Sequence, residues 1–390
     1  MPSGAIDRFL GRWSVSGRAI DVVRRGDEVI VTILGIPEEF SPRLVHDAAD
    51  PAAGILRGGH LDGTTIRVLD DDGTDRLIVG DVLSFPRWND DSPVSPVMTH
   101  LMPPPDVDPA TEASYRAMLH DTLSANGAVV EPVAGIDVGA WVHWLTQQDT
   151  VLFHGSQNGD IEALAPRRTS YEINNQAGRG NLAAVYATHA GLWAMWFSII
   201  DRSRVRGSIR SGAEEHVRPD GVRLPAYYFS LNHRQLADPP LSDGWLYLLP
   251  RDTFERQPLF PGGSPSPEWC SRHTVRPLAR IPIRPHDFPL LDRIGGHDDS
   301  ELLRYHELVD VIRENTEHAT ATSDGVVLRL VWSPTLADII DEYMVLSRAM
   351  MPDISRTLQH DGQDSAYLHL QTTPELAVML HNSFHDLMAG

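Results

Sequence analysis

A proline-dense segment between residues 91 and 110 most limits what this chain can fold into. It contains the run Ser92-Pro93-Val94-Ser95-Pro96 and then the run Pro103-Pro104-Pro105-Asp106. Proline lacks a backbone N–H and clashes with the preceding helical turn, so a stretch this dense forms neither a helix nor a central strand. The sequence therefore predicts a linker here, and a fold of several parts on either side of it.

The residues before this linker predict a small antiparallel β-sheet or barrel, as a domain over residues 1–90. Its apolar runs are rich in Val and Ile and lie at residues 19–23, 28–33, 64–69 and 76–79. The first two flank Arg24-Arg25-Gly26-Asp27, which supplies the glycine of a hairpin turn. The last two flank the acidic cluster Asp70-Asp71-Asp72-Gly73, which resembles part of a calcium loop. Because it lacks the later glutamate at loop spacing, a hairpin turn is the favoured interpretation.

The residues after the proline runs predict three further parts, which makes the expected fold class α+β and multidomain. Residues 91–145 hold the linker and a helix over 109–125 that opens at acidic Asp108. Residues 146–292 alternate short apolar strands with polar stretches, among them an apolar helix at 192–200 and a long charged loop at 203–225. Residues 296–390 predict a small α/β domain, with helices at 300–316, 336–358 and 374–388 and strands at 325–332 and 365–370.

The charge of the chain argues against several classes of partner. There are 33 basic and 53 acidic residues, and the net charge is −20. An acidic field repels nucleic-acid phosphates and so disfavours nucleic-acid binding, although the arginines of residues 202–223 are a local exception. No run approaches the roughly 18 apolar residues of a membrane span, and the N-terminus lacks the basic-then-apolar order of a secretory signal. We expect a cytoplasmic protein that does not contact a membrane.

Residue types that are missing or rare exclude several kinds of chemistry. The chain has no lysine, which rules out Schiff-base catalysis and a phosphate-loop lysine. The single cysteine, Cys270, excludes internal disulfides and cysteine-cluster zinc sites, and a buried inert thiol is favoured over a nucleophile paired with nearby His273. His381 and His385 have a spacing that can hold zinc, but no third ligand suggests itself. We expect no metal.

The remaining candidate chemistry lies between residues 151 and 283. An apolar strand ends in His154, Gly155 and Ser156, where the glycine lets a ligand approach the backbone closely. A second apolar strand, 32 residues later, carries Tyr186, Ala187 and Thr188 and leads into an aromatic-rich helix that contains Phe197. A third strand carries Glu268-Trp269-Cys270.

The order of these motifs resembles that in ADP-ribosyltransferases of the diphtheria-toxin and poly(ADP-ribose) polymerase type, whose triad is His-Tyr-Glu. Phe197 follows Tyr186 by eleven residues, which is similar to the offset of the second aromatic in the polymerases. The resemblance implies a split β-sheet domain that uses NAD as its substrate. Such a domain releases nicotinamide and transfers ADP-ribose to a macromolecule or a small molecule.

The resemblance also implies a role for each residue. His154 would bond the adenosine-side ribose, the Gly155 backbone would pair with the nicotinamide amide, and Tyr186 and Phe197 would stack on the nicotinamide ring. Glu268 would accept from the nicotinamide-side ribose and stabilise the oxocarbenium-like cation. The NAD-binding set implied in this way is His154, Gly155, Ser156, Tyr186, Ala187, Thr188 and Phe197, with Glu268, His154 and Tyr186 as the catalytic triad.

The sequence leaves three matters open. Ala194 stands where the polymerases have a serine that contacts nicotinamide. Glu255 is an alternative catalytic carboxylate, as are Glu214 and Glu215. An RNA 2′-phosphotransferase that uses NAD, and a non-catalytic binding protein on a degenerate transferase fold, are the alternative functions.

Overall fold

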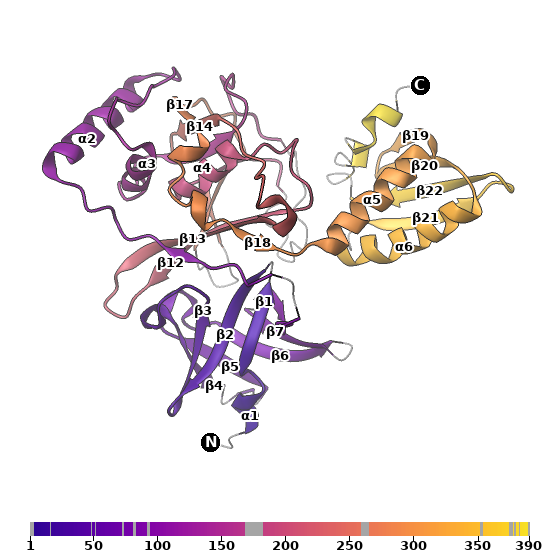
Figure 1. Cartoon of the computed structure of the whole chain (residues 1–390), viewed down its shortest axis with the longest axis horizontal. Coiled ribbons are helices and arrows are strands. Elements are labelled where there is room, and N and C mark those ends of the chain that lie inside the picture. Colours follow the sequence, from indigo (N-terminus) through magenta and orange to yellow (C-terminus); the bar gives the residue numbers. More distant parts are fainter. Residues whose placement is uncertain are drawn as a thin grey trace. The chain divides into compact units, whose positions relative to one another are not determined.

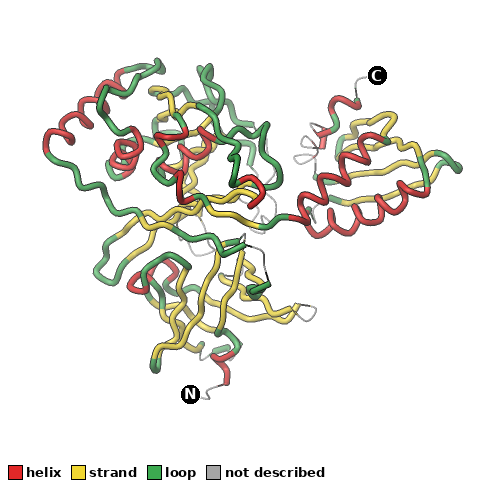
Figure 2. Tube along the Cα trace, in the orientation of Figure 1, coloured by secondary structure: helices red, strands yellow, loops and turns green. Residues whose placement is uncertain are grey.

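A computed structural model describes residues 4–388, with gaps at residues 16, 48, 51, 72–73, 81–82, 92–93, 168–181, 259–264, 352–353, 374–376, 378–379 and 382. The chain forms two compact units (Figures 1 and 2). The first comprises Met1–Pro166 and Ala184–Asp298, and the second comprises Arg167–Ala183 and Asp299–Gly390. No helix among the described residues is long and apolar enough to cross a membrane.

The N-terminal part of the first unit is an eight-stranded antiparallel sheet whose strands are neighbours in chain order. The strands are β1 (Gly11–Val15), β2 (Arg18–Arg25), β3 (Glu28–Ile33), β4 (Arg43–His46), β5 (Ala53–Arg57), β6 (Thr65–Asp71), β7 (Thr74–Val79) and β8 (Leu83–Pro86), with short helical turns α1 (Gly4–Asp7), η1 (Glu38–Phe40) and η2 (Gly59–Leu61). Beyond β8, Arg87 bridges to Trp13 on β1, so the sheet curls into a near-barrel. The predicted antiparallel sheet or barrel is therefore confirmed.

The hairpins of this sheet follow from local sequence. Arg25 pairs with Glu28 and leaves a two-residue turn, in which Gly26 has a φ of 59°. This left-handed conformation costs glycine nothing, which explains the residue type at the turn. β6 and β7 also form the predicted hairpin, with Asp71 opposite Thr74, while Asp72 and Gly73 lie outside the described residues.

The segment after the proline runs contains the predicted helix and one that was not predicted. Helix α2 (Pro109–Ser124) begins where Asp108 accepts hydrogen bonds from the next turn, with proline at its first position. Helix α3 (Val138–Thr146) is almost entirely buried and is capped by Asp137. The short strand β9 (His100–Leu101) pairs at the edge of β13, as the proline density allows.

The rest of the first unit contains two sheets that bracket an apolar helix. The larger sheet has the order β15-β16-β11-β10-β14-β17 and is antiparallel throughout. Its elements are β10 (Leu152–Ser156), β11 (Val185–Thr188), β14 (Gly244–Leu249), β15 (Glu255–Pro258), β16 (Pro265–Ser271) and β17 (Ala279–Ile283). The smaller sheet contains β12 (Ile209–Val217), β13 (Arg223–Asn232) and β18 (Gly295–His297). Helix α4 (Gly191–Ile199) packs on β10 and is almost fully buried, and short turns η3 (His233–Gln235), η4 (Pro285–Asp287) and η5 (Leu291–Arg293) complete the unit.

The prediction of a long loop at residues 203–225 was wrong, because residues 209–217 form strand β12. Successive side chains of this strand meet different neighbours. Glu214 forms an ion pair with Arg18 of the N-terminal sheet, and the Oγ of Ser211 accepts from the indole of Trp193 on α4. Both faces are therefore held by polar contacts, and the strand lacks the apolar alternation by which strands are usually predicted.

The second unit is a four-stranded antiparallel sheet with helices α5 and α6 packed on one face (Figure 1). Its elements are α5 (Ser300–Glu314), β19 (Thr316–Thr322), β20 (Gly325–Val331), α6 (Pro334–Met350), β21 (Ser355–His360), β22 (Ser365–Gln371) and the turn η6 (His385–Leu387), with the sheet order β19-β20-β22-β21. Leu308 and Ile340, from the two helices, belong to one apolar cluster with Leu328 and Leu368 from the strands.

Two predictions for this unit need correction. The helix expected over 336–358 ends at Met350, and residues 355–360 form β21. The guanidinium of Arg356 on β21 donates to the carbonyls of Ser347 and Met351, and so satisfies the last turn of α6. Strand β19 was not predicted. Much of the helix expected at 374–388 lies outside the described residues.

Candidate functional site

The larger sheet brings the three proposed triad residues onto neighbouring strands. His154 lies on β10, Tyr186 on β11 and Glu268 on β16, and these strands are adjacent in the order β16-β11-β10. Register places Glu268 opposite Thr188, two residues from Tyr186. Residues that are separated by up to 114 positions (268 − 154) thus lie on three adjacent strands of one sheet. The register puts the side chains of Tyr186 and Glu268 on one face, whereas His154, next to Phe153, starts from the other face.

The ladder between β10 and β11 is much shorter than its neighbours. It consists of the single pair Phe153 and Thr188, whereas β10 pairs with β14 over five residues and β11 pairs with β16 over four. Past this pair, the His154 side chain bridges the two strands, with its Nδ1 2.8 Å from the carbonyl oxygen of Tyr186. The sheet is held there by an imidazole in place of backbone pairing.

This contact fixes the tautomer of His154. A carbonyl oxygen only accepts, so Nδ1 carries the proton and the neutral ring presents Nε2 as an acceptor. Burial lowers the pKa of His154, and the charge of Arg202 lowers it further, against the opposing effect of the hydrogen bond to Tyr186. The imidazole is therefore neutral near pH 7.

Gly155 is the point at which α4 rests on β10. A Cβ at this position would lie 2.0 Å from the carbonyl oxygen of Ala194 and 2.7 Å from the backbone nitrogen of Ser198. Both are backbone atoms, so no larger residue fits without moving the helix. The contact brings Phe197, whose ring packs 5.8 Å from that of Trp193, to the side of β10. Ala194 contributes its carbonyl to this contact.

Register also places the candidate carboxylates. Glu255 lies opposite Cys270, which lies opposite Tyr186, while Glu268 lies opposite Thr188. Side chains directly opposite in a sheet share a face, so both glutamates lie on the face that carries Tyr186. Glu268 is half-buried and Glu255 is exposed.

The other two rival carboxylates lie on β12. Glu214 makes a bidentate ion pair with Arg18, including a 2.6 Å contact, and also accepts from Nε2 of His216 at 3.1 Å. This carboxylate is therefore part of the contact between sheets. Glu215 is half-buried, and its charge acts on His189.

The thiol of Cys270 is buried and protonated, as the sequence predicted. Burial raises its pKa to about 12, and the charge of nearby Glu268 adds to the effect. His273 is exposed and its backbone N–H bonds Ser271. A nucleophilic pair of Cys270 and His273 has no support in this geometry.

A cluster around Trp269 was not predicted from the sequence. The indole of Trp269 donates to Nδ1 of His189 at 3.1 Å, and the guanidinium of Arg251 lies 4.6 Å from the indole centroid. Burial, with the charge of Arg256, lowers the pKa of His189 to about 4. Trp269 and His189 are 80 residues apart in the sequence, so no local pattern predicts their contact.

The turn after Ser156 is also held by residues that the sequence did not single out. The Tyr247 hydroxyl donates to the carbonyl of Asn158 at 2.7 Å and accepts from the N–H of Ile161 at 3.2 Å. Arg280 donates to the carbonyl of Gly159. These contacts fix the backbone that leaves the His-Gly-Ser motif.

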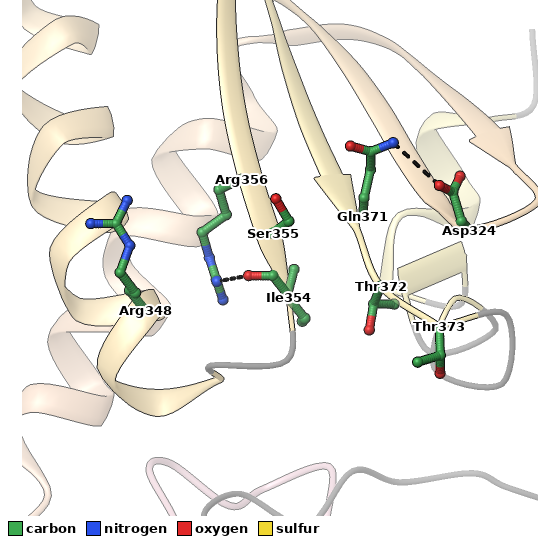
Figure 3. A pocket seen from close by; sticks show the side chains of 8 residues that line it. All are labelled: Asp324, Arg348, Ile354, Ser355, Arg356, Gln371, Thr372 and Thr373. Atoms are coloured by element: carbon green, nitrogen blue, oxygen red, sulfur yellow. Dashed lines mark hydrogen bonds between the residues drawn. The ribbon is translucent and has the colours of Figure 1, made fainter.

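The second unit contains a cavity of about 650 Å³ at the end of its sheet (Figure 3). Its lining residues are Asp324, Arg348, Ile354, Ser355, Arg356, Gln371, Thr372 and Thr373. Two of its polar side chains have partners within the lining, since Arg356 donates to the backbone carbonyl of Ile354 and Gln371 donates to the carboxylate of Asp324. The predicted triad and NAD-binding residues do not line it.

His381, one of the two histidines with a spacing that can hold zinc, has backbone partners in the structure. His381 places its Nε2 against the carbonyls of Thr322 and Gly325. Within the described part of the chain, no three His, Cys, Asp or Glu side chains converge as a metal would require.

Comparisons with protein-family models, with curated proteins and with solved structures gave no significant match to this chain.

Proposed function

We propose that this chain is an NAD-dependent ADP-ribosyltransferase that releases nicotinamide and transfers ADP-ribose to an acceptor. The observation that carries the proposal is the placement of His154, Tyr186 and Glu268 on three adjacent strands, with the ladder between β10 and β11 reduced to one pair. Together with the order of the motifs in the sequence, this favours an NAD-binding site over an ordinary sheet interior.

The neutral imidazole of His154 suits the role that the family resemblance gives it. With Nδ1 donating to Tyr186, the lone pair of Nε2 is the acceptor for a ribose hydroxyl. Past Phe153, the β10 backbone leaves the β11 ladder, and Gly155 offers its backbone to the nicotinamide amide. Phe197 and Tyr186 then stack on the nicotinamide ring and exclude water from the reacting bond.

Glu268 supplies the charge that the reaction needs. When the bond between the nicotinamide nitrogen and the ribose C1′ breaks, the electron pair leaves with nicotinamide and positive charge develops on the ribose. The Glu268 carboxylate stabilises that charge, and an acceptor oxygen or nitrogen then bonds C1′ and loses its proton. Water in the acceptor's place gives ADP-ribose, nicotinamide and a proton.

The test is nicotinamide release from NAD by the full chain, beside Glu268→Gln and Glu255→Gln. Glutamine keeps the shape and removes the charge, so Glu268→Gln is expected to lose roughly a hundredfold or more in turnover while retaining NAD affinity. Glu255→Gln is the matched control on the neighbouring strand and is expected to retain turnover.

Three results would change the assignment. If the wild type neither binds nor cleaves NAD, the proposed function is wrong. If the wild type binds NAD without releasing nicotinamide, even with candidate acceptors, a binding protein replaces the enzyme. If Glu255→Gln is the inactive variant, the catalytic carboxylate is Glu255.

A further inference from the structure

The residues proposed to hold NAD include no permanent cation. His154 is neutral, the other proposed contacts are backbone groups, hydroxyls and aromatic rings, and Glu268 is an anion. NAD carries an anionic diphosphate between its two riboses, and the chain itself has a net charge of −20. A protein this acidic repels NAD unless a local cation offsets the charge.

Arg202 lies beside this group of residues. It follows the C-terminal end of α4, which rests on the backbone of Gly155 through Phe197 and Ser198. Its guanidinium carbon lies 5.8 Å from the centroid of the Phe197 ring. The same guanidinium is close enough to His154 for its charge to act on the imidazole.

No acidic side chain of the described chain neutralises Arg202. Its neighbour Arg204 bonds both carboxylate oxygens of Asp238 and the carbonyl of Leu241, whereas the described contact of Arg202 is the Phe197 ring. Arg202 is exposed, so an anion can reach it. A guanidinium beside an aromatic ring and a neutral imidazole is a strong donor to phosphate oxygens, which it binds in a bidentate manner.

We infer that Arg202 binds the diphosphate of NAD, between the ribose contact at His154 and the nicotinamide contact at Phe197. The inference rests on the proposed function, and it adds the residue that recognises the anionic part of the substrate. Arg202 was not among the site residues predicted from the sequence, where it appears only as one of the arginines of residues 202–223.

Two ligands distinguish diphosphate binding by Arg202 from the other contacts proposed for the site. ADP-ribose contains the diphosphate, and nicotinamide contains no phosphate. Calorimetric titration of the full chain with each is expected to show that Arg202→Gln weakens ADP-ribose binding about tenfold or more and leaves nicotinamide binding unchanged. Arg202→Lys is expected to retain part of the ADP-ribose affinity, because it keeps the charge and loses the bidentate geometry.

Arg204→Gln is the matched control, because it removes an exposed arginine two residues away that already has an acidic partner. It is expected to bind both ligands as the wild type does. Increasing salt is expected to weaken ADP-ribose binding more in the wild type than in Arg202→Gln, since the lost contact is ionic. Thermal unfolding of each variant confirms that the fold is retained.

The outcomes distinguish this inference from the proposed function. If wild type and Arg202→Gln bind ADP-ribose equally, Arg202 does not hold the diphosphate, and the proposed function stands. If Arg202→Gln weakens nicotinamide as much as ADP-ribose, Arg202 acts by shaping the site, and the inference is overturned. If the wild type binds neither NAD nor ADP-ribose, the proposed function itself fails.

Discussion

The two large sheets of the first unit are both antiparallel, but they are joined in different ways. In the N-terminal sheet each strand pairs with the next in the chain, and β2 and β3 are paired over six residues. In the larger central sheet the neighbours β16, β11, β10 and β14 are distant in sequence, and its middle ladder has one pair. Local hairpins thus close the N-terminal sheet with backbone bonds, whereas the central sheet, whose strands are distant in sequence, has a middle ladder of one pair.

Substitution of Gly155, which follows the single pair between β10 and β11, is expected to have the largest effect on the stability of the central sheet. Gly155→Ala places a Cβ 2.0 Å from a backbone carbonyl, which cannot move without displacing α4. We expect it to destabilise the fold by at least about 3 kcal/mol, enough to lower its soluble yield. Gly26→Asn in the N-terminal sheet is the control, since its turn is open and asparagine tolerates a positive φ. Thermal unfolding measures both, and an unaffected Gly155→Ala variant would contradict the packing.

The second largest expected effect is a loss of stability of the central sheet at acidic pH. His189 has a pKa lowered to about 4, below the usual 6.5 of an unfolded histidine. The unfolded chain therefore binds a proton first, so the stability that His189 contributes is present above pH 6.5 and lost as the pH falls to 4. The loss reaches up to about 3 kcal/mol.

The variant His189→Gln tests this pH dependence. Glutamine can accept from the Trp269 indole but does not titrate, so the variant is expected to lose less stability than the wild type between pH 7 and pH 4. The exposed His273→Gln is the matched control and is expected to follow the wild type. Denaturant unfolding measures the free energy of unfolding at each pH. Equal pH profiles for the wild type and His189→Gln would show that protonation of His189 does not cause the loss of stability.

The smallest expected effect concerns the hydrogen bond by which the His154 side chain joins β10 to β11. His154→Ala removes the donor to the Tyr186 carbonyl and is expected to cost about 1 to 2 kcal/mol. Amide hydrogen exchange is expected to speed up in residues 185–188 and to stay unchanged in β2 and β3. His46→Ala is the matched control, because His46 on β4 makes no side-chain hydrogen bond within the described chain. Unchanged exchange in β11 would show that the bridge does not hold the strands together.

The elements that the sequence predicted are those specified by nearby residues. Asp108 and Pro109 mark the start of α2, and Gly26 marks the turn between β2 and β3. Two of the features that it missed depend on distant partners. β12 is a strand because Arg18 and Trp193 satisfy its polar side chains, and α6 ends early because Arg356 bonds its last carbonyls.

The candidate site shows the same limit. The sequence identified His154, Tyr186 and Glu268 by their order along the chain and by a family resemblance. Their adjacency depends on strand order, which spacing does not encode. Arg202 was not among the predicted site residues, because its contact with Phe197 and its lack of an acidic partner among the described residues are properties of the folded chain.

The ion pair between Arg18 and Glu214 limits how this protein can be divided into working pieces. Both side chains are largely buried, Arg18 also lies 4.9 Å from the Tyr228 ring, and Ala226 of β13 belongs to the apolar core of the N-terminal sheet. A fragment cut at the proline segment would leave the Glu214 carboxylate without its cation, which costs several kcal/mol for a buried pair. We therefore expect that transfer of the candidate site into another protein requires the N-terminal sheet as well. The ion pair, and not the proline-rich segment, determines which parts of this unit can be separated.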